Sequence, residues 1–326
     1  MPRGVSSIRD RSGEAHHGEP GTRARGSWRL RKSLVFVPGK SPKPLPAIHK
    51  RYLWRCLRRG VLLLDREVAE QVDACGFHLA TWNYLYYGEH ESLAADVPWI
   101  ELLLDSGGAT AADVREARRW SKWLTRLLYN VGDSAHWLIG WLPDPRVQAM
   151  IRDTLRYFEN VDGIADRIRA LVKSVIQRAV SESDSVCLVS HSMGTVIAYE
   201  SLWELTYEDG CPASIDLFLT LGSPLGMNYV QKRLLGVGDG TRRYPSGIHR
   251  WVNVSAVGDL VSVDKSVADD FAVMVDRGLT EHIEDRHRGV YTTFRNDQGL
   301  NPHRSYGYLV HPAVAAAVVE WWRRSE

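Results

Sequence analysis

Short apolar runs alternate with helical patterns through the second half of this chain. The apolar runs are SVCLVS, IDLFLTLGSP, HRWVNVSAVGD and GVYTTFR, and each predicts a β-strand. The helical patterns that follow them are MGTVIAYESLWEL, GMNYVQKRLLG, VADDFAVMVDRG and HPAVAAAVVEWW. Repeated strand–helix units with continuous apolar strands are typical of a parallel sheet that helices cover on both faces. The sequence therefore predicts an α/β fold with a mostly parallel central sheet.

The first half of the chain carries similar signals. SLVFVPG, at residues 33–39, predicts a buried strand that ends at a Pro-Gly turn, and the aromatic segment FHLATWNYLYYG, at residues 77–88, predicts a second strand. Two helices are predicted over PLPAIHKRYLWRCLRRGV and NVDGIADRIRALVKSVIQRAV. Their buried faces are marked by Ile48, Leu53, Cys56 and Leu57 in the first, and by Ile164, Ile168, Leu171, Val172 and Val175 in the second.

The alternation stops between about residues 95 and 158, where the chain has helical patterns and no convincing strand. Six of the twelve tryptophans lie between residues 82 and 141, at positions 82, 99, 120, 123, 137 and 141. Two interpretations stay open for these rings: they pack against the rest of the core, or they form a lid or the wall of an acyl pocket. The sequence thus predicts a helical, Trp-rich insertion.

The N-terminal segment differs from the rest in charge and apolar content. Residues 1–32 hold eight Lys or Arg and three Asp or Glu, so they contribute +5 to a net charge of +2, and the remainder contributes −3. Such a segment buries too little apolar surface to offset its ordering entropy, which predicts a disordered basic tail over residues 1–32 and one α/β domain over residues 33–326. The mildly negative domain argues against a nucleic-acid partner.

Cysteine use and hydropathy bear on the compartment. The cysteines Cys56, Cys75, Cys187 and Cys211 are scattered and imply no disulfide framework, so a reducing cytoplasm is the expected location. The sequence has no run approaching 18 uninterrupted apolar residues, which argues against a transmembrane helix. Docking on an anionic lipid surface through the basic tail and the Trp/Leu helix stays open as a partner hypothesis.

The stretch VCLVSHSMGTVIAYESL, residues 186–202, contains the nucleophile candidate. Ser192 stands between an apolar strand and a small-residue helix, in a turn that would lift its hydroxyl above the sheet and direct the next N–H at a reacting oxygen. The usual pattern is Gly-x-Ser-x-Gly; here Gly194 is present, and Ser190 replaces the first glycine as a small, tolerable residue. His191, beside the nucleophile, is interpreted as structural.

LVSHSMGTVIAY resembles the nucleophile elbow of the serine hydrolases with the α/β-hydrolase fold, particularly the lipase-like and esterase-like members. LTLGSPLGM resembles the following strand of those members, which often ends in Gly-Ser-Pro or Gly-Thr-Pro. The resemblance covers about residues 33–326 and implies a Ser-His-Asp triad in the chain order Ser, acid, His. It leaves open a catalytically inactive interaction protein of the same fold, and an acyltransferase, thioesterase or peptidase with the same triad.

In the chain order that the resemblance implies, the acid and the base of the triad follow Ser192 in the sequence. Asp259 follows the apolar strand RWVNVSAV and a glycine turn, and is the predicted acid; Asp264 is its main competitor, and Asp216 lies too early in its strand. His303 stands in the loop GLNPHRSYGYLVHP before the last helix and is the predicted base. The other histidines after Asp259 are His282, His287 and His311. EHIEDRHRG, residues 281–289, is interpreted as a solvated charged surface and not as a metal site.

An oxyanion hole needs two N–H donors. Met193 is predicted to supply the first, as the residue after the nucleophile. In the segment FVPGKSPKPLP, the Pro38-Gly39 dipeptide stands where lipase-like hydrolases usually have His-Gly, so the resemblance implies Lys40 as the second donor; a plain Pro-Gly turn is the alternative. The expected function is hydrolysis of a small or lipid-like carboxylic ester through an acyl-enzyme, with no cofactor and no metal.

Overall fold

A six-stranded parallel sheet forms the centre of the computed structural model, which describes residues 30–119, 153–259, 261–262 and 266–324. The strand order is β2-β1-β3-β4-β5-β6, and every neighbouring pair is parallel. The strands are β1 (Lys32–Val37), β2 (Gly76–Leu79), β3 (Ser185–His191), β4 (Ile215–Leu221), β5 (Ile248–Val254) and β6 (His282–Arg286). A separate antiparallel pair joins β7 (Arg295–Asn296) to β8 (Gly299–Leu300).

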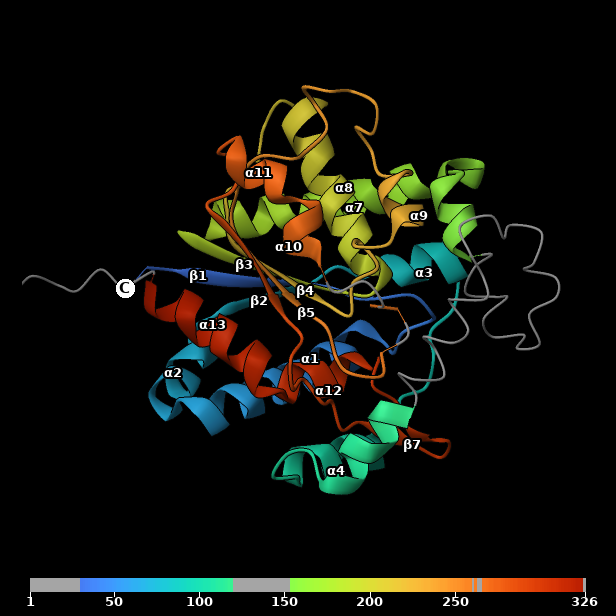
Figure 1. The fold of residues 1–326 in the computed structure, drawn as a ribbon, viewed down its shortest axis with the longest axis vertical. Coiled ribbons are helices and arrows are strands. Elements are labelled where there is room, and N and C mark those ends of the chain that lie inside the picture. Colours follow the sequence, from blue (N-terminus) through green and yellow to red (C-terminus); the bar gives the residue numbers. More distant parts are fainter. Residues whose placement is uncertain (1–29, 120–152, 260, 263–265, 325–326) are drawn as a thin grey trace, which may run out of the picture.

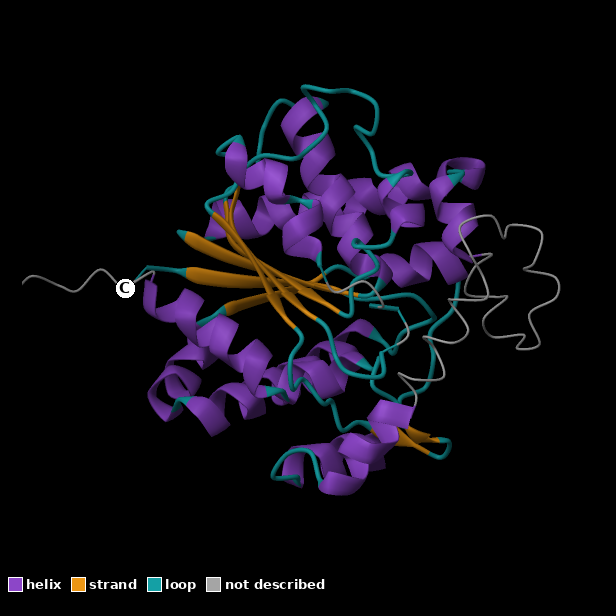
Figure 2. Ribbon diagram, in the orientation of Figure 1, coloured by secondary structure: helices purple, strands orange, loops and turns teal. Residues whose placement is uncertain are grey.

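Helices cover both faces of this sheet (Figures 1 and 2). One face carries α3 (Trp82–Tyr87), α7 (Ile164–Glu182), α8 (Met193–Tyr207), α9 (Asn228–Gln231), α10 (Val267–Asp270) and α11 (Ala272–Asp276). The other carries α1 (Pro46–Leu64), α2 (Arg66–Gln71), α4 (Val97–Asp105), α12 (Ser305–Val310) and α13 (Pro312–Arg324). Short 3-10 turns lie at Val72–Ala74 and Val161–Gly163. This is the α/β architecture predicted from the sequence, and it has the form of an α/β-hydrolase-like fold.

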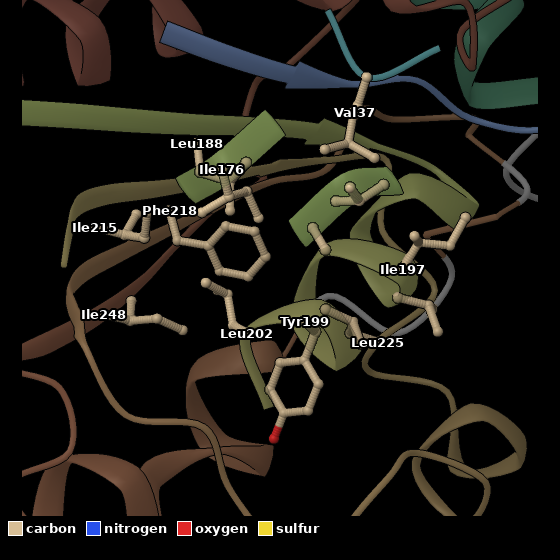
Figure 3. Close-up of a cluster of buried hydrophobic side chains, with 14 of the residues drawn as sticks. Val37, Ile176, Leu188, Ile197, Tyr199, Leu202, Ile215, Phe218, Leu225 and Ile248 are labelled. Carbon is tan, nitrogen blue, oxygen red and sulfur yellow. The ribbon is translucent and has the colours of Figure 1, made fainter. Parts of the chain in front are cut away.

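Alternation along each strand divides its side chains between two hydrophobic cores. In β1, Val35 and Val37 face the α7–α8 side, whereas Leu34 and Phe36 face the α1–α13 side. Figure 3 shows the first core, where Phe218 of β4 and Ile176 of α7 meet the side chains of α8. Because both sheet faces are buried, the strands carry the continuous apolar runs seen in the sequence.

The two predicted helices of the first half are present, but their buried faces differ from the prediction at three residues. α7 buries Ile164, Ile168 and Val172, while the predicted Leu171 and Val175 are only partly buried against the same core. α1 buries Leu53, Cys56 and Leu57, but Ile48 is exposed, and its neighbour His49 is buried instead. The prediction for Ile48 is wrong because Ile48 lies in the first turn of α1, next to Pro46 and Leu45 at the surface.

The prediction of a strand over residues 77–88 is wrong for its second half. The strand β2 ends at Leu79, and α3 begins at Trp82. Trp82 and Tyr86, four residues apart, are both buried, so the aromatic run has helical spacing. Gly88, with φ of 73°, ends the helix in the left-handed conformation that favours glycine.

The last strand of the sheet lies in a different segment from the predicted one. GVYTTFR contributes only Arg295 to the small β7–β8 pair, and the sixth strand is β6, within the charged segment EHIEDRHRG. β6 is an edge strand, which explains its charged composition: Ile283 is buried against the core, while Arg286 pairs with Glu284 and Glu320. The interpretation of this segment as a solvated surface therefore missed a strand.

Three further segments differ in detail from the prediction. The helix predicted over GMNYVQKRLLG is limited to the short α9, the one over VADDFAVMVDRG is divided into α10 and α11, and the loop predicted before α13 contains α12. In the insertion, α4 and helical residues 111–119 and 153–158 are described, and residues 120–152, with Trp120, Trp123, Trp137 and Trp141, lie outside the described residues. Residues 1–29 of the predicted tail do as well. In the described ranges, every helix is too short or too polar to cross a membrane.

Candidate active site

Ser192 occupies a sharp turn between β3 and α8, with φ of 54° and ψ of −132°. Residues other than glycine rarely adopt a positive φ, so the backbone at Ser192 is strained. Contacts with neighbouring residues hold it in this conformation. The Ser192 N–H donates to the carbonyl oxygen of Leu221, at the end of β4, over 2.9 Å. Gly194 is required by close packing, since a Cβ there would lie 2.5 Å from the carbonyl oxygens of Val37 and Pro38.

The turn lies at the point where the strand order of the sheet reverses. β1 connects to β2 on one side, and the chain then returns to place β3 on the other side of β1. In open α/β sheets, ligands bind outside the carboxyl ends of the strands at such a point. Ser192 follows β3 and Gly39 follows β1, so both lie there.

The structure brings the three predicted triad residues together. His303 Nε2 lies 2.9 Å from Ser192 Oγ, and His303 Nδ1 lies 2.9 Å from each carboxylate oxygen of Asp259. Because a carboxylate only accepts, His303 Nδ1 carries the proton toward Asp259, and Nε2 is free to accept the proton of the serine hydroxyl. This is the arrangement in which a serine can be activated as a nucleophile.

Asp259 is buried and held in its ionised form. Burial raises its pKa, but electrostatic attraction to His303, hydrogen bonds from His303 and Tyr308, and the Val261 N–H together lower the pKa from 3.8 to about 2. The Tyr308 hydroxyl donates to Asp259 Oδ2 over 2.5 Å and accepts from the Ala256 N–H over 2.9 Å. The carboxylate is therefore held by Tyr308 and Val261 as well as by His303, in a position from which it can orient the imidazole and stabilise its positive charge.

Gly222 makes room for the acid–base pair. It is the glycine of the LGSP segment after β4, and its φ is 54°. A Cβ at this position would lie 2.7 Å from Asp259 Oδ2 and 3.2 Å from His303 Nδ1. The hydrogen bond between Asp259 and His303 thus depends on the absence of a side chain at Gly222.

Substituting Gly222→Ala should slow the reaction of Ser192 with a fluorophosphonate about 100-fold, because the added methyl group displaces the carboxylate from His303. Gly210→Ala is the matched control, since Gly210 also has a positive φ of 62° but a Cβ there meets nothing within 4 Å. The fluorophosphonate labelling rates of the two variants, measured alongside thermal unfolding, separate the effect of the clash from that of backbone strain. Equal losses in both variants would contradict this account of Gly222.

His191 and Ser190, the two residues before the nucleophile, are buried within the fold. His191 is buried, and burial together with the nearby His303 lowers its pKa well below the ordinary value, so it is neutral. Its Nε2–H donates to the His303 carbonyl oxygen over 2.7 Å, which anchors the histidine loop. Ser190, in place of the usual glycine, is fully buried between Val37 and Thr220, and its hydroxyl has no hydrogen-bond partner within the described residues.

Substituting Ser190→Ala should leave activity unchanged and raise the free energy of unfolding by up to about 1 kcal/mol, since it removes a buried hydroxyl that lacks a partner. Ser201→Ala is the matched control, because the equally buried Ser201 hydroxyl donates to the Ile197 carbonyl oxygen over 2.7 Å and its loss should destabilise. Urea unfolding of both variants measures the difference. A Ser190→Ala protein that is less stable than Ser201→Ala would be evidence against this reading of Ser190.

The two predicted oxyanion-hole residues border Ser192. Met193 is the first residue of α8, whose first N–H groups have no partner inside the helix. Lys40 follows Gly39, where a Cβ would lie 2.7 Å from Ser192 Cβ. The loop after β1 therefore packs directly against the nucleophile, and Lys40 Nζ donates to Thr154 Oγ1 over 2.9 Å. The role of the two N–H groups as oxyanion donors stays a prediction.

The other candidates from the sequence lie apart from this triad. Asp264 lies outside the described residues. Asp216 accepts from the Val186 N–H, at the amino ends of the strands, and His311 Nδ1 accepts from the Ala313 N–H at the start of α13. His282 is the first residue of β6, and His287 follows that strand. Within the described ranges, no group of three or more His, Cys, Asp and Glu side chains is arranged to hold a metal ion.

Sequence reasoning missed Tyr308 and Gly222 as neighbours of the acid–base pair. Tyr308 lies five residues after His303 in an apolar segment. The available sequence signal was a polar hydroxyl in a stretch that is expected to be buried. Gly222 was noticed only as part of the Gly-Ser-Pro resemblance. A scan against protein-family models and a search of curated proteins found no match for this chain.

Proposed function

We propose that this protein is a serine hydrolase that cleaves carboxylic esters through a Ser192–His303–Asp259 triad. One observation carries the proposal: the continuous hydrogen-bonded chain from Ser192 Oγ through His303 to a buried, ionised Asp259, with 2.9 Å at each step. The strained turn at Ser192 supports it, because strain of this kind is retained where the surroundings demand a particular side-chain placement.

The reaction would proceed in two halves. His303 Nε2 takes the hydroxyl proton while Ser192 Oγ bonds to the ester carbonyl carbon, and the tetrahedral intermediate then collapses as the alcohol leaves with that proton. Water attacks the acyl-enzyme, again giving its proton to His303, and the acid is released as Ser192 recovers its proton. Asp259 holds the imidazole tautomer and stabilises the imidazolium formed in each half.

The carbonyl oxygen of the ester becomes negatively charged in the tetrahedral intermediate and needs hydrogen-bond donors beside Ser192. In the proposal the N–H groups of Met193 and Lys40 supply them, each contributing about 10²–10³ in rate. Gly39 supports this assignment, since its lack of a side chain lets the backbone of the loop approach Ser192. The chemistry of the triad fits acyl transfer from esters, thioesters and amides; carboxylic esters are the substrate class of this proposal, and the Trp-rich insertion favours an apolar acyl group.

A panel of p-nitrophenyl esters with acyl chains from acetyl to dodecanoyl tests the proposal. The expected result is turnover with an initial burst of about one p-nitrophenolate per protein, which reports the acyl-enzyme, and a rate that rises with acyl length. The Ser201→Ala protein, which is altered on α8 and outside the triad, should hydrolyse these esters like wild type. Folded protein that turns over none of these esters would refute the ester-hydrolase proposal.

A further inference from the structure

We propose that Trp82 and Asn83, the first two residues of α3, are positioning residues that fix the peptide groups of residues 38–41 and thereby aim the Lys40 N–H at the oxyanion. We call residues 38–41 the β1 loop. The inference rests on the proposed function, which it deepens by naming what holds the oxyanion hole in place.

Side chains of α3 hold the carbonyl groups of the β1 loop. Trp82 Nε1 donates to the Pro38 carbonyl oxygen over 2.8 Å. Asn83 Nδ2 donates to the carbonyl oxygens of Gly39 over 2.7 Å and Ser41 over 3.0 Å. Three peptide groups of the loop are thus fixed by two adjacent residues.

The same helix also stabilises an unfavourable backbone conformation in the loop. Ser41 has φ of 79°, which residues other than glycine rarely adopt. Its N–H donates to the Tyr87 hydroxyl over 3.1 Å, at the other end of α3, while its carbonyl is held by Asn83. Strained backbone held by several contacts is a common property of functional loops.

The helix α3 is itself rigidly placed. Trp82 is 1% exposed and Asn83 is 2% exposed, so the donors lie in a water-poor environment. Trp82 packs edge-on against Tyr86, with ring centroids 6.1 Å apart, and both belong to the core beneath α7 and α8. Within the described residues, both hydrogen bonds of the Asn83 side chain go to the β1 loop, so its amide group binds this loop and no other described segment.

Peptide geometry connects these bonds to catalysis. In a trans peptide the C=O and the following N–H point in opposite directions, so the bond from Asn83 to the Gly39 carbonyl turns the Lys40 N–H away from Asn83. Gly39 meanwhile packs against Ser192 on the catalytic side. Without Asn83, rotation of this peptide would present a carbonyl oxygen, an acceptor, where the oxyanion needs a donor.

The test compares Asn83→Leu and Trp82→Phe with wild type and with a matched control. Trp321→Phe is that control, because the buried Trp321 Nε1 donates to Ser185 Oγ at the opposite end of β3. The concentration of competent sites is first measured by titration to completion with a fluorophosphonate, and kcat on p-nitrophenyl butyrate is expressed per titrated site. Inhibition by an aryl boronic acid, which forms a tetrahedral adduct on the serine, is measured in parallel.

The expected result for Asn83→Leu is a kcat per site lowered about 100-fold with KM little changed, and a boronic acid that binds more weakly by a similar factor. Trp82→Phe should show a smaller loss in the same direction, and it carries the test if Asn83→Leu does not fold. Trp321→Phe should keep wild-type kcat per site. A purely structural role would reduce the number of sites without changing kcat per site.

Two failures are distinguishable. Wild type that reacts normally, together with Asn83→Leu and Trp82→Phe proteins of unchanged kcat per site, would overturn this inference alone. Wild type whose Ser192 reacts with neither fluorophosphonate nor ester would overturn the proposed function, and the positioning role with it.

Discussion

Substituting Ser192→Ala should lower kcat for p-nitrophenyl ester hydrolysis by about 10⁴–10⁶-fold and leave the fold unchanged. The hydroxyl is the group that bonds to the acyl carbon, and no neighbouring group in the described site can replace it. What remains is the contribution of binding and of the oxyanion donors, which do not depend on the serine. Steady-state kinetics at saturating ester measures the loss.

The control for this variant is Ser201→Ala. Ser201 lies on α8, the helix that follows Ser192, and outside the triad. Circular dichroism and thermal unfolding should show both variants folded. Ser192→Ala protein that retains more than a few per cent of wild-type kcat would contradict the assignment of Ser192 as nucleophile.

Substituting Asp259→Asn should lower kcat about 10⁴-fold with a small change in KM. The asparagine Nδ2 is a donor and cannot accept the proton of His303 Nδ1, so the imidazole would take the other tautomer and present an N–H to Ser192. Such a histidine cannot remove the hydroxyl proton. The ratio of kcat values for variant and wild type at neutral pH measures the effect.

The matched control is Asp216→Asn, because Asp216 accepts a hydrogen bond from the Val186 N–H at the opposite edge of the sheet.

Stability gives a second readout of Asp259→Asn. The pKa of Asp259 is lowered from 3.8 to about 2, so its ionised form stabilises the fold above about pH 4, and this contribution is lost as the pH falls toward 2. The free energy of unfolding of Asp259→Asn should therefore fall less steeply than that of wild type over this range. Full activity of Asp259→Asn would rule out the proposed acid.

The inner strands of the sheet and the grouping of Ser192, Asp259 and His303 could be predicted because their signals are local. Val186 to Val189 form a continuous apolar run, and the Ser-His-Ser-Met-Gly turn follows it directly, so strand, turn and helix were each visible in the sequence. Asp259 and His303 could be placed near Ser192 because Asp259 follows a recognisable strand and His303 stands in a Gly/Asn/Pro loop before the last helix, both at the carboxyl edge of the sheet. The contacts of His303 with Asp259, 44 residues away, and with Ser192, 111 residues away, are a product of the topology.

The remaining parts of the site depend on tertiary contacts that leave no local pattern. Gly222 is required by the position of Asp259, and Tyr308 by the carboxylate it binds; neither requirement can be read from neighbouring residues. Asn83 was missed because Trp82 and Tyr86 have strong strand propensity, whereas burial on one helical face decides their conformation. β6 was missed because an edge strand can carry charges that a central strand cannot.

The most direct test is to treat the full-length protein with a fluorophosphonate and to locate the adduct by peptide mass spectrometry. The proposal predicts one adduct, on Ser192, together with the loss of ester hydrolysis in proportion to labelling, and a much slower reaction for Ser192 in His303→Ala, whose serine lacks the base 2.9 Å away. An adduct on another residue, or folded wild-type protein that takes up no label, would contradict the central claim that Ser192 is an activated nucleophile.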